Sequence, residues 1–169
     1  MRSLKIVLLA TVAAAALSTA TKAADPIVMV DTPAPMAAAV GLDGPYVGLF
    51  ILGSTAPSTV GIGVDIGANF SSGGLLFGVE GDAAWELSGD YDLQVHGKLG
   101  VMASDNAAIY GLAGLGYNTA NGTYVPIGIG AEFGVSDGMT LAASVEYDWD
   151  IAGPGASPVV GKVGVNFHF

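Results

Sequence analysis

Residues 75–87 read LLFGVEGDAAWEL, and this stretch decides how the rest of the chain is interpreted. Apolar side chains stand at odd positions, among them Phe77, Val79 and Trp85, whereas Glu80 and Asp82 stand at even positions. Successive side chains on a β-strand point to opposite faces, so the pattern predicts a strand with one apolar face and one polar face. Which of the two faces points outward determines what kind of protein this is.

The same alternation recurs along the chain from residue 44 to residue 169. Candidate strands are 45–53, 60–70, 75–87, 91–103, 107–117, 124–135, 139–149 and 159–169. They are separated by turn-forming stretches such as SSGG at 71–74 and SDG at 136–138. All 26 glycines follow residue 23, and no long helical period interrupts the strands. Eight evenly spaced strands joined as hairpins predict an all-β fold, an antiparallel up-and-down barrel.

The first 23 residues have the features of a secretory signal peptide. Arg2 and Lys5 precede an apolar run, which ends in small residues before Ala23. We therefore expect three parts: a signal peptide (1–23), a periplasmic N-terminal linker (24–43) and the barrel (44–169). After residue 23 the basic residues are Lys98 and Lys162, against fifteen acidic residues in the whole chain. Such a balance excludes nucleic acid as a partner, because phosphate binding needs clustered lysine and arginine.

Two kinds of barrel fit this alternation. A soluble, lipocalin-like barrel would turn its apolar face inward around a ligand, whereas a membrane barrel turns it toward lipid. Only 12% of the residues are charged, which is low for a soluble surface. Export and the sorting of aromatic residues into two girdles also favour a transmembrane barrel in contact with outer-membrane lipid. The expected girdle residues are Trp85, Tyr117, Tyr147 and Trp149 at the external interface, with Phe70, Phe133, Phe167 and Phe169 at the periplasmic one.

Four segments carry a resemblance to a known family: GPYVGLF, LFGVEGDAAW, HGKLGVM and VGVNFHF. With these, residues 44–169 resemble the small eight-stranded outer-membrane barrels of Gram-negative bacteria, of the OmpA-type or opacity-type membrane domain. The resemblance implies the cell outer membrane as location, a monomer, and Phe169 as an aromatic signal for the barrel-assembly machinery. The chain departs from the family in having no arginine after residue 23, with Lys98 at a basic position. Its short external loops speak against adhesion.

The polar face is expected to form a charged network in the lumen. Its members are Asp65, Glu80, Asp82, Glu86, His96, Lys98, Glu132, Glu146, Asp148 and Lys162. A turn centred on 88–90 would place Glu80 opposite Lys98 and Asp82 opposite His96; a loop centred on Pro154 would place Glu146 opposite Lys162. Strands 45–53 and 107–117 are apolar on both faces, so their orientation stays open.

We expect a structural or envelope-integrity role, because a barrel of eight strands is normally filled by its own side chains. Inward glycines and surplus acids leave passive small-solute permeation with cation preference as a further possibility. A soluble ligand-binding barrel and an outer-membrane lipid-modifying enzyme are the alternatives. No catalytic residue, metal site or cofactor is predicted: His96 has no inward serine nearby, and His168 stands at the rim.

Overall fold

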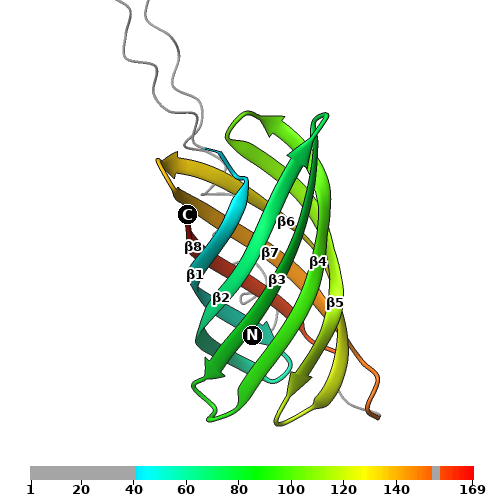
Figure 1. Ribbon diagram of the computed structural model, residues 1–169. Helices are drawn as coiled ribbons and strands as arrows, with labels where there is room; N and C mark the ends of the chain where they lie inside the picture. Colours follow the sequence, from blue (N-terminus) through cyan, green and yellow to red (C-terminus); the bar gives the residue numbers. More distant parts are fainter. Residues whose placement is uncertain (1–40, 154–156) are drawn as a thin grey trace, which may run out of the picture. The chain divides into compact units, whose positions relative to one another are not determined.

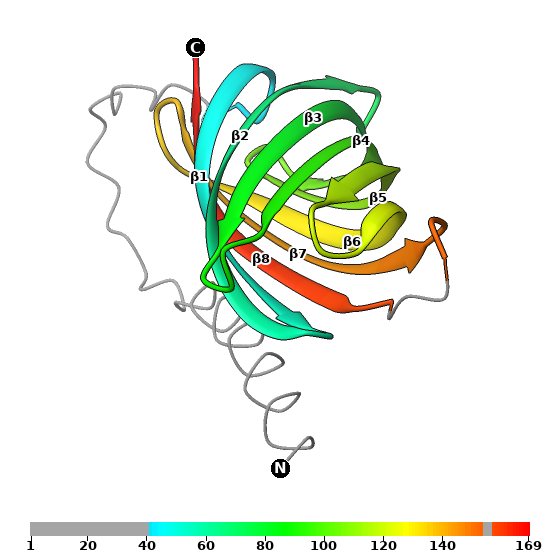
Figure 2. The ribbon, with the colours of Figure 1, turned by 90° about the horizontal axis from the view of Figure 1, so that it is seen from below.

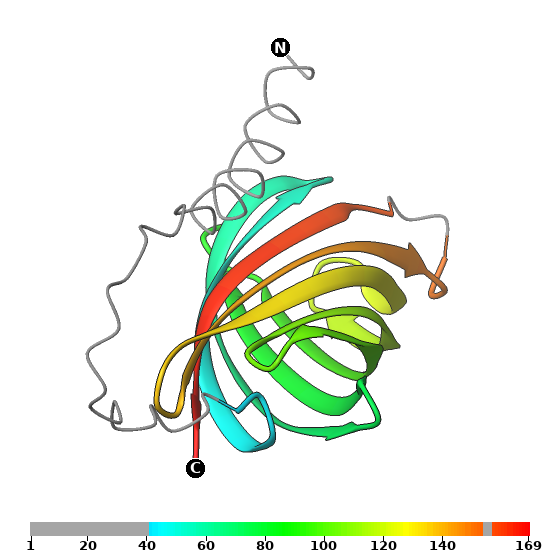
Figure 3. The same ribbon diagram turned by 90° about the horizontal axis from the view of Figure 1, so that it is seen from above.

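The computed structural model describes residues 41–153 and 157–169, which form one closed antiparallel barrel (Figure 1). Its strands are β1 (Gly44–Thr55), β2 (Ser58–Ser72), β3 (Leu75–Glu86), β4 (Tyr91–Ser104), β5 (Ala107–Asn118), β6 (Gly122–Ser136), β7 (Met139–Asp150) and β8 (Val159–His168). Each strand pairs with its neighbours in sequence, and β1 pairs with β8 to close the ring (Figures 2 and 3). The eight predicted strands are confirmed, and every strand begins and ends within two residues of the predicted positions.

The expected signal peptide and all but the last three residues of the expected linker lie outside the described residues. Within residues 41–153 and 157–169, no helix has the length and apolarity needed to cross a membrane.

The two ends of the barrel differ in their connections. One end, which we call the turn end (upper in Figure 1), carries the start of β1, the end of β8 and three two-residue turns. In the first of these turns Gly73 and Gly74 both have positive φ, 60° and 83°, a conformation that suits glycine and matches the twist of the flanking strands. The opposite end, the loop end, carries a two-residue turn between β1 and β2 and three longer connections, of four residues (β3–β4), three residues (β5–β6) and eight residues (β7–β8). Shorter turns at one end and longer loops at the other are typical of membrane-spanning barrels.

The face prediction is confirmed: apolar side chains point out and polar ones point into the lumen. Outward residues in the middle of the strands include Ile66, Val95 and Ile129, which are 65%, 66% and 69% exposed. Inward charged residues are buried instead; Lys98 is 4% exposed. A water-soluble barrel requires the reverse arrangement, whereas lipid solvates this one.

Three aromatic residues of the two strands of undecided orientation point inward. Tyr46 and Phe50 of β1 and Tyr110 of β5 are all buried in the lumen. Inner glycines make this possible, because several of them lie beneath an aromatic side chain from another strand. A Cβ atom added at Gly130 would come 2.6 Å from the Tyr110 ring. At these glycines the space inside the barrel is therefore occupied by aromatic rings.

Candidate functional site

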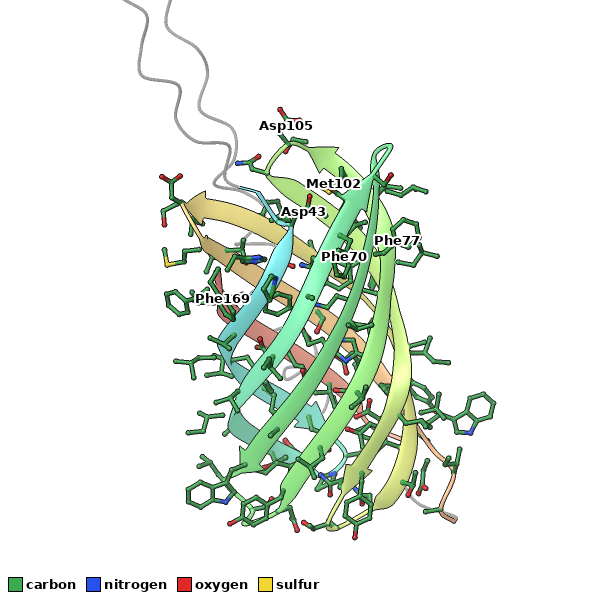
Figure 4. All side chains as sticks on the ribbon, in the orientation of Figure 1. Asp43, Phe70, Phe77, Met102, Asp105 and Phe169 are labelled. Carbon is green, nitrogen blue, oxygen red and sulfur yellow. The ribbon has the colours of Figure 1, made fainter. Side chains whose placement is uncertain are left out.

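The lumen is the candidate functional site, and at the turn end it is closed by an apolar cluster. Leu42, which precedes β1, is 1% exposed and packs with Leu76, Ala108, Tyr110 and Leu112. Met102, labelled in Figure 4, packs against this cluster and is partly buried. Sequence reasoning placed residue 42 in the linker, and nothing in the alternation of the strands could have indicated that it enters the barrel.

Lys98 lies at the centre of the first charged cluster. Its Nζ donates to a Glu80 carboxylate oxygen and, over 2.9 Å, to the Tyr46 hydroxyl. The Tyr46 hydroxyl in turn donates to Glu80. The ammonium also lies 5.2 Å from the Tyr46 ring centre and 5.0 Å from that of Tyr110, within the range of a cation–π interaction. His96 Nε2 is 3.1 Å from Glu80 Oε1, although not in line for a hydrogen bond.

Lys162 lies at the centre of a second charged cluster, nearer the loop end. Its Nζ is 2.7 Å from Asp82 Oδ2 and 3.2 Å from Glu146 Oε1, and it also donates to the Gln94 amide oxygen. Gln94 Nε2 donates to Glu146 over 2.8 Å. One ammonium from β8 is thus bound by side chains of β3, β4 and β7. Only β7 of these three strands neighbours β8, so the cluster joins strands from opposite sides of the barrel wall.

The predicted register of these ion pairs is wrong by two residues. Glu80 lies opposite His96, while Gly78 lies opposite Lys98. The hairpin is centred one residue earlier than expected, since Trp85 pairs with Tyr91. In the same hairpin Asp82 lies opposite Gln94, not His96.

The last hairpin shows the same shift. Lys162 lies opposite Ser144, and Glu146 lies opposite Val160. The contacts of both lysines with glutamate nevertheless form, because a long side chain reaches the diagonal neighbour on the next strand.

A third cluster surrounds Glu132 near the turn end. Glu132 is fully buried and accepts hydrogen bonds from Thr140 Oγ1 at 2.6 Å and Asn69 Nδ2 at 3.1 Å. His168 Nε2 lies 3.2 Å from the same carboxylate and 3.3 Å from the threonine hydroxyl. Asn69 and Asn166 were not among the predicted site residues, although both stand at inward positions of their strands.

The remaining predicted lumen acids, Asp65, Glu86 and Asp148, are also buried on the inner face. Asp65 lies opposite Asp82 in the register of β2 and β3. Asp92 is a further inward acid that was missed, even though it shares its parity with Gln94 and His96 on β4.

The predicted girdle residues lie on the outer face in two groups. Trp85, Tyr117, Tyr147 and Trp149 are in the half of the barrel nearer the loop end, and each is about half exposed or more. Phe70 and Phe169 lie near the turn end (Figure 4). Phe167 is 46% exposed and Phe133 is partly exposed. Phe169 is 77% exposed, while its backbone N–H donates to the Pro45 carbonyl over 3.1 Å.

Three side chains of the types that bind metal ions lie close together, but lysine side chains already bind two of them. Glu80, Asp82 and His96 each bring a ligand atom within 4.8 Å of the others. Lys98 bonds the first carboxylate and Lys162 the second, so ammonium groups stand where a metal ion would have to compete.

No protein-family model matches the chain, and no curated protein sequence matches it closely enough to count as a relative. Solved structures do match it. The outer membrane enzyme PagL superimposes with a TM-score of 0.62 at 10% identity, over 73% of this chain and 99% of that one. The chain has the fold of the small outer-membrane β-barrels.

Other matches agree on the fold. The N-terminal β-barrel domain of Pseudomonas aeruginosa OprF gives a TM-score of 0.58 at 16% identity, over 76% of this chain and 99% of that domain. A de novo designed transmembrane β-barrel gives 0.55 at 25% identity, over 74% and 94%. A closed barrel with an outward apolar belt is a membrane-spanning structure of the outer-membrane type, since it leaves no backbone hydrogen bond unmade in lipid.

Proposed function

We propose that this outer-membrane barrel has a structural role in the cell envelope and that its lumen is closed. The observation that carries the proposal is the filling of the lumen by the protein's own side chains. The apolar cluster around Leu42 occupies the turn end, and Lys98 and Lys162 are bound across the middle. Two cavities within the lumen measure about 30 Å³ each, which is room for a few water molecules at most.

Passive permeation with cation preference would require these clusters to separate. The test is planar-bilayer recording with the purified, folded protein. We expect no steady conductance above that of the lipid alone, because three layers of side chains would have to move before an ion could pass. Sustained single-channel currents with cation selectivity would overturn the closed-lumen proposal in favour of permeation.

The location and biogenesis of the barrel are part of the same proposal. Outer-membrane lipid is its partner through the apolar belt, and the barrel-assembly machinery inserts it as a monomer, with Phe169 as the terminal signal. The exposed side chain of Phe169 supports that role, since a recognition element must be accessible. Expression of the full chain in a Gram-negative host, followed by membrane fractionation, tests it. Recovery in the soluble periplasmic fraction would contradict the membrane assignment.

We also propose that the barrel is not an enzyme, although one of the similar structures is one. Catalysis by a hydroxyl nucleophile needs a base that takes its proton and an acid that orients the base. Here the Thr140 hydroxyl donates directly to Glu132, and both contact the same nitrogen of His168. His168 Nδ1 has no hydrogen-bond partner among the described residues, so nothing holds the imidazole as a triad would. Release of fatty acid from lipid by the purified barrel, abolished in the His168→Ala variant, would refute this.

A further inference from the structure

The loop end of the lumen contains a group of acidic residues that the structural role does not explain. Glu86 of β3, Asp92 of β4 and Asp148 of β7 line one cavity, together with Glu146. We call Glu86, Asp92 and Asp148 the acidic mouth. Lys162 also lines this cavity and is its only cationic lining residue, but it is bound to Glu146 and Asp82.

Neutral donors satisfy two members of the acidic mouth. Asn118 Nδ2 donates to Glu86 Oε1 over 2.9 Å and to Asp92 Oδ2 over 3.3 Å. The Tyr124 hydroxyl donates to Asp92 Oδ1 over 2.7 Å. These bonds orient the carboxylates but supply no positive charge. Among the described residues no ammonium group forms an ion pair with Glu86, Asp92 or Asp148, because Lys162 is held by Asp82 and Glu146.

Asp148 is the member that points to a ligand. It is only 7% exposed, and its Oδ1 has no hydrogen-bond partner among the described residues. A buried carboxylate oxygen without a partner is costly, and such groups normally bind a donor or a cation. The cavity that it lines measures about 30 Å³, large enough for one ion of ordinary radius with a water molecule.

We propose that the acidic mouth binds a hard divalent cation of the Ca²⁺ class, with Asp148 and Asp92 as ligands and Glu86 at the rim. Carboxylate and water oxygens are what Ca²⁺ prefers, and its variable coordination suits ligands from three different strands. Softer metals prefer nitrogen and sulfur ligands, and neither histidine nor cysteine is among the residues that line this cavity.

The test uses Tb³⁺, a luminescent substitute for Ca²⁺, with the folded protein in detergent micelles. Tyrosine excited in the ultraviolet transfers energy to a nearby Tb³⁺ ion, and the Tyr124 hydroxyl contacts the ligand Asp92 directly. We expect saturable Tb³⁺ emission at one equivalent, which excess Ca²⁺ reverses. The Asp148→Asn variant, which keeps the shape of the side chain, should weaken Ca²⁺ binding at least tenfold.

A matched control is Asp105→Asn, which removes one carboxylate at the turn end, far from the acidic mouth (Figure 4). This variant should bind as the unaltered protein does. Heat-modifiable migration on a gel establishes that both variants are folded. As a second readout, Ca²⁺ should raise the urea midpoint of the unaltered protein and not that of Asp148→Asn.

Absence of saturable emission, or equal binding by the two variants, would overturn the proposal, and the carboxylates would then be neutralised by protons. The acidic mouth would be present whether or not the barrel conducts ions. The Tb³⁺ titration and the bilayer recordings therefore test the cation site and the closed lumen separately.

Discussion

Replacing Lys98 with methionine tests whether the first charged cluster stabilises the barrel. Methionine has a similar length and keeps the apolar part of the contact, but it removes the ammonium that bonds Glu80 and Tyr46. Removing one partner of a buried ion pair typically costs about 3–5 kcal/mol, because the other charge is left without compensation. Glu80 keeps the Tyr46 hydroxyl and has His96 nearby, so we expect a loss near the lower figure, about 3 kcal/mol.

The free energy of unfolding is measured by urea titration of the barrel in lipid vesicles. Trp85 and Trp149 lie on the outer face and are 53% and 59% exposed, so their fluorescence reports the transfer from lipid to water. The double variant Lys98→Met with Glu80→Gln removes both charges, and we expect it to recover more than half of the loss. The Asp105→Asn variant serves as a control for the loss of a charge outside the lumen.

Two results would refute this reasoning. A loss below about 1 kcal/mol in Lys98→Met would mean that water or a rearranged side chain compensates Glu80, as for an exposed pair. A double variant as unstable as the single one would mean that the lysine acts through packing, and that the glutamate charge plays no part.

Three further experiments test other features of the barrel. Gly67→Ala puts a Cβ atom against the Tyr46 hydroxyl and 2.6 Å from a backbone carbonyl oxygen, so it should lower the free energy of unfolding by about 1–3 kcal/mol in the urea assay. Its control is Gly97→Ala, where the nearest atom is 3.9 Å from the added Cβ atom, and this variant should be as stable as the unaltered protein. Leu42→Ala should cost about 2–5 kcal/mol by opening a void in the turn-end cluster; an unchanged midpoint would show that the residue does not seal the lumen. Val95→Arg places a charge on the outer face near mid-membrane and should lower the free energy of unfolding by about 2–4 kcal/mol. Val101→Arg lies nearer the interface and should lower it by about 0–1 kcal/mol. Equal losses in the two variants would contradict the placement of the membrane.

The fold could be predicted because one rule repeats along the whole chain. In strands such as β3, Val79 and Glu80 point to opposite faces. Exchanging the inward and outward faces would have placed the charge of Glu80 in lipid. Short turns of glycine, aspartate and serine then fixed where each strand ends. These signals are local, and they need no knowledge of how distant strands meet.

Details that depend on distant contacts could not be predicted. The register of the β3–β4 hairpin depends on which of residues 87–90 lies at the centre of the turn. The composition of the turn does not distinguish between two adjacent residues as that centre. Tyr46 is one of several apolar residues in a strand without alternation, and it points inward because Gly67, opposite it, leaves room for its ring and because Glu80 and Lys98 bond its hydroxyl. Leu42 enters the lumen from outside the strands, so no strand pattern includes it.

The pairing of β1 with β8 has a consequence for synthesis and export. Residues such as Tyr46 and His168, at opposite ends of the barrel sequence, are neighbours in the final structure. Without β8 the polypeptide would have two unpaired sheet edges, β1 and β7, and such edges recruit other chains. Closure therefore has to wait until β8 has been made and exported, and we expect that the open chain must be kept from aggregating until then.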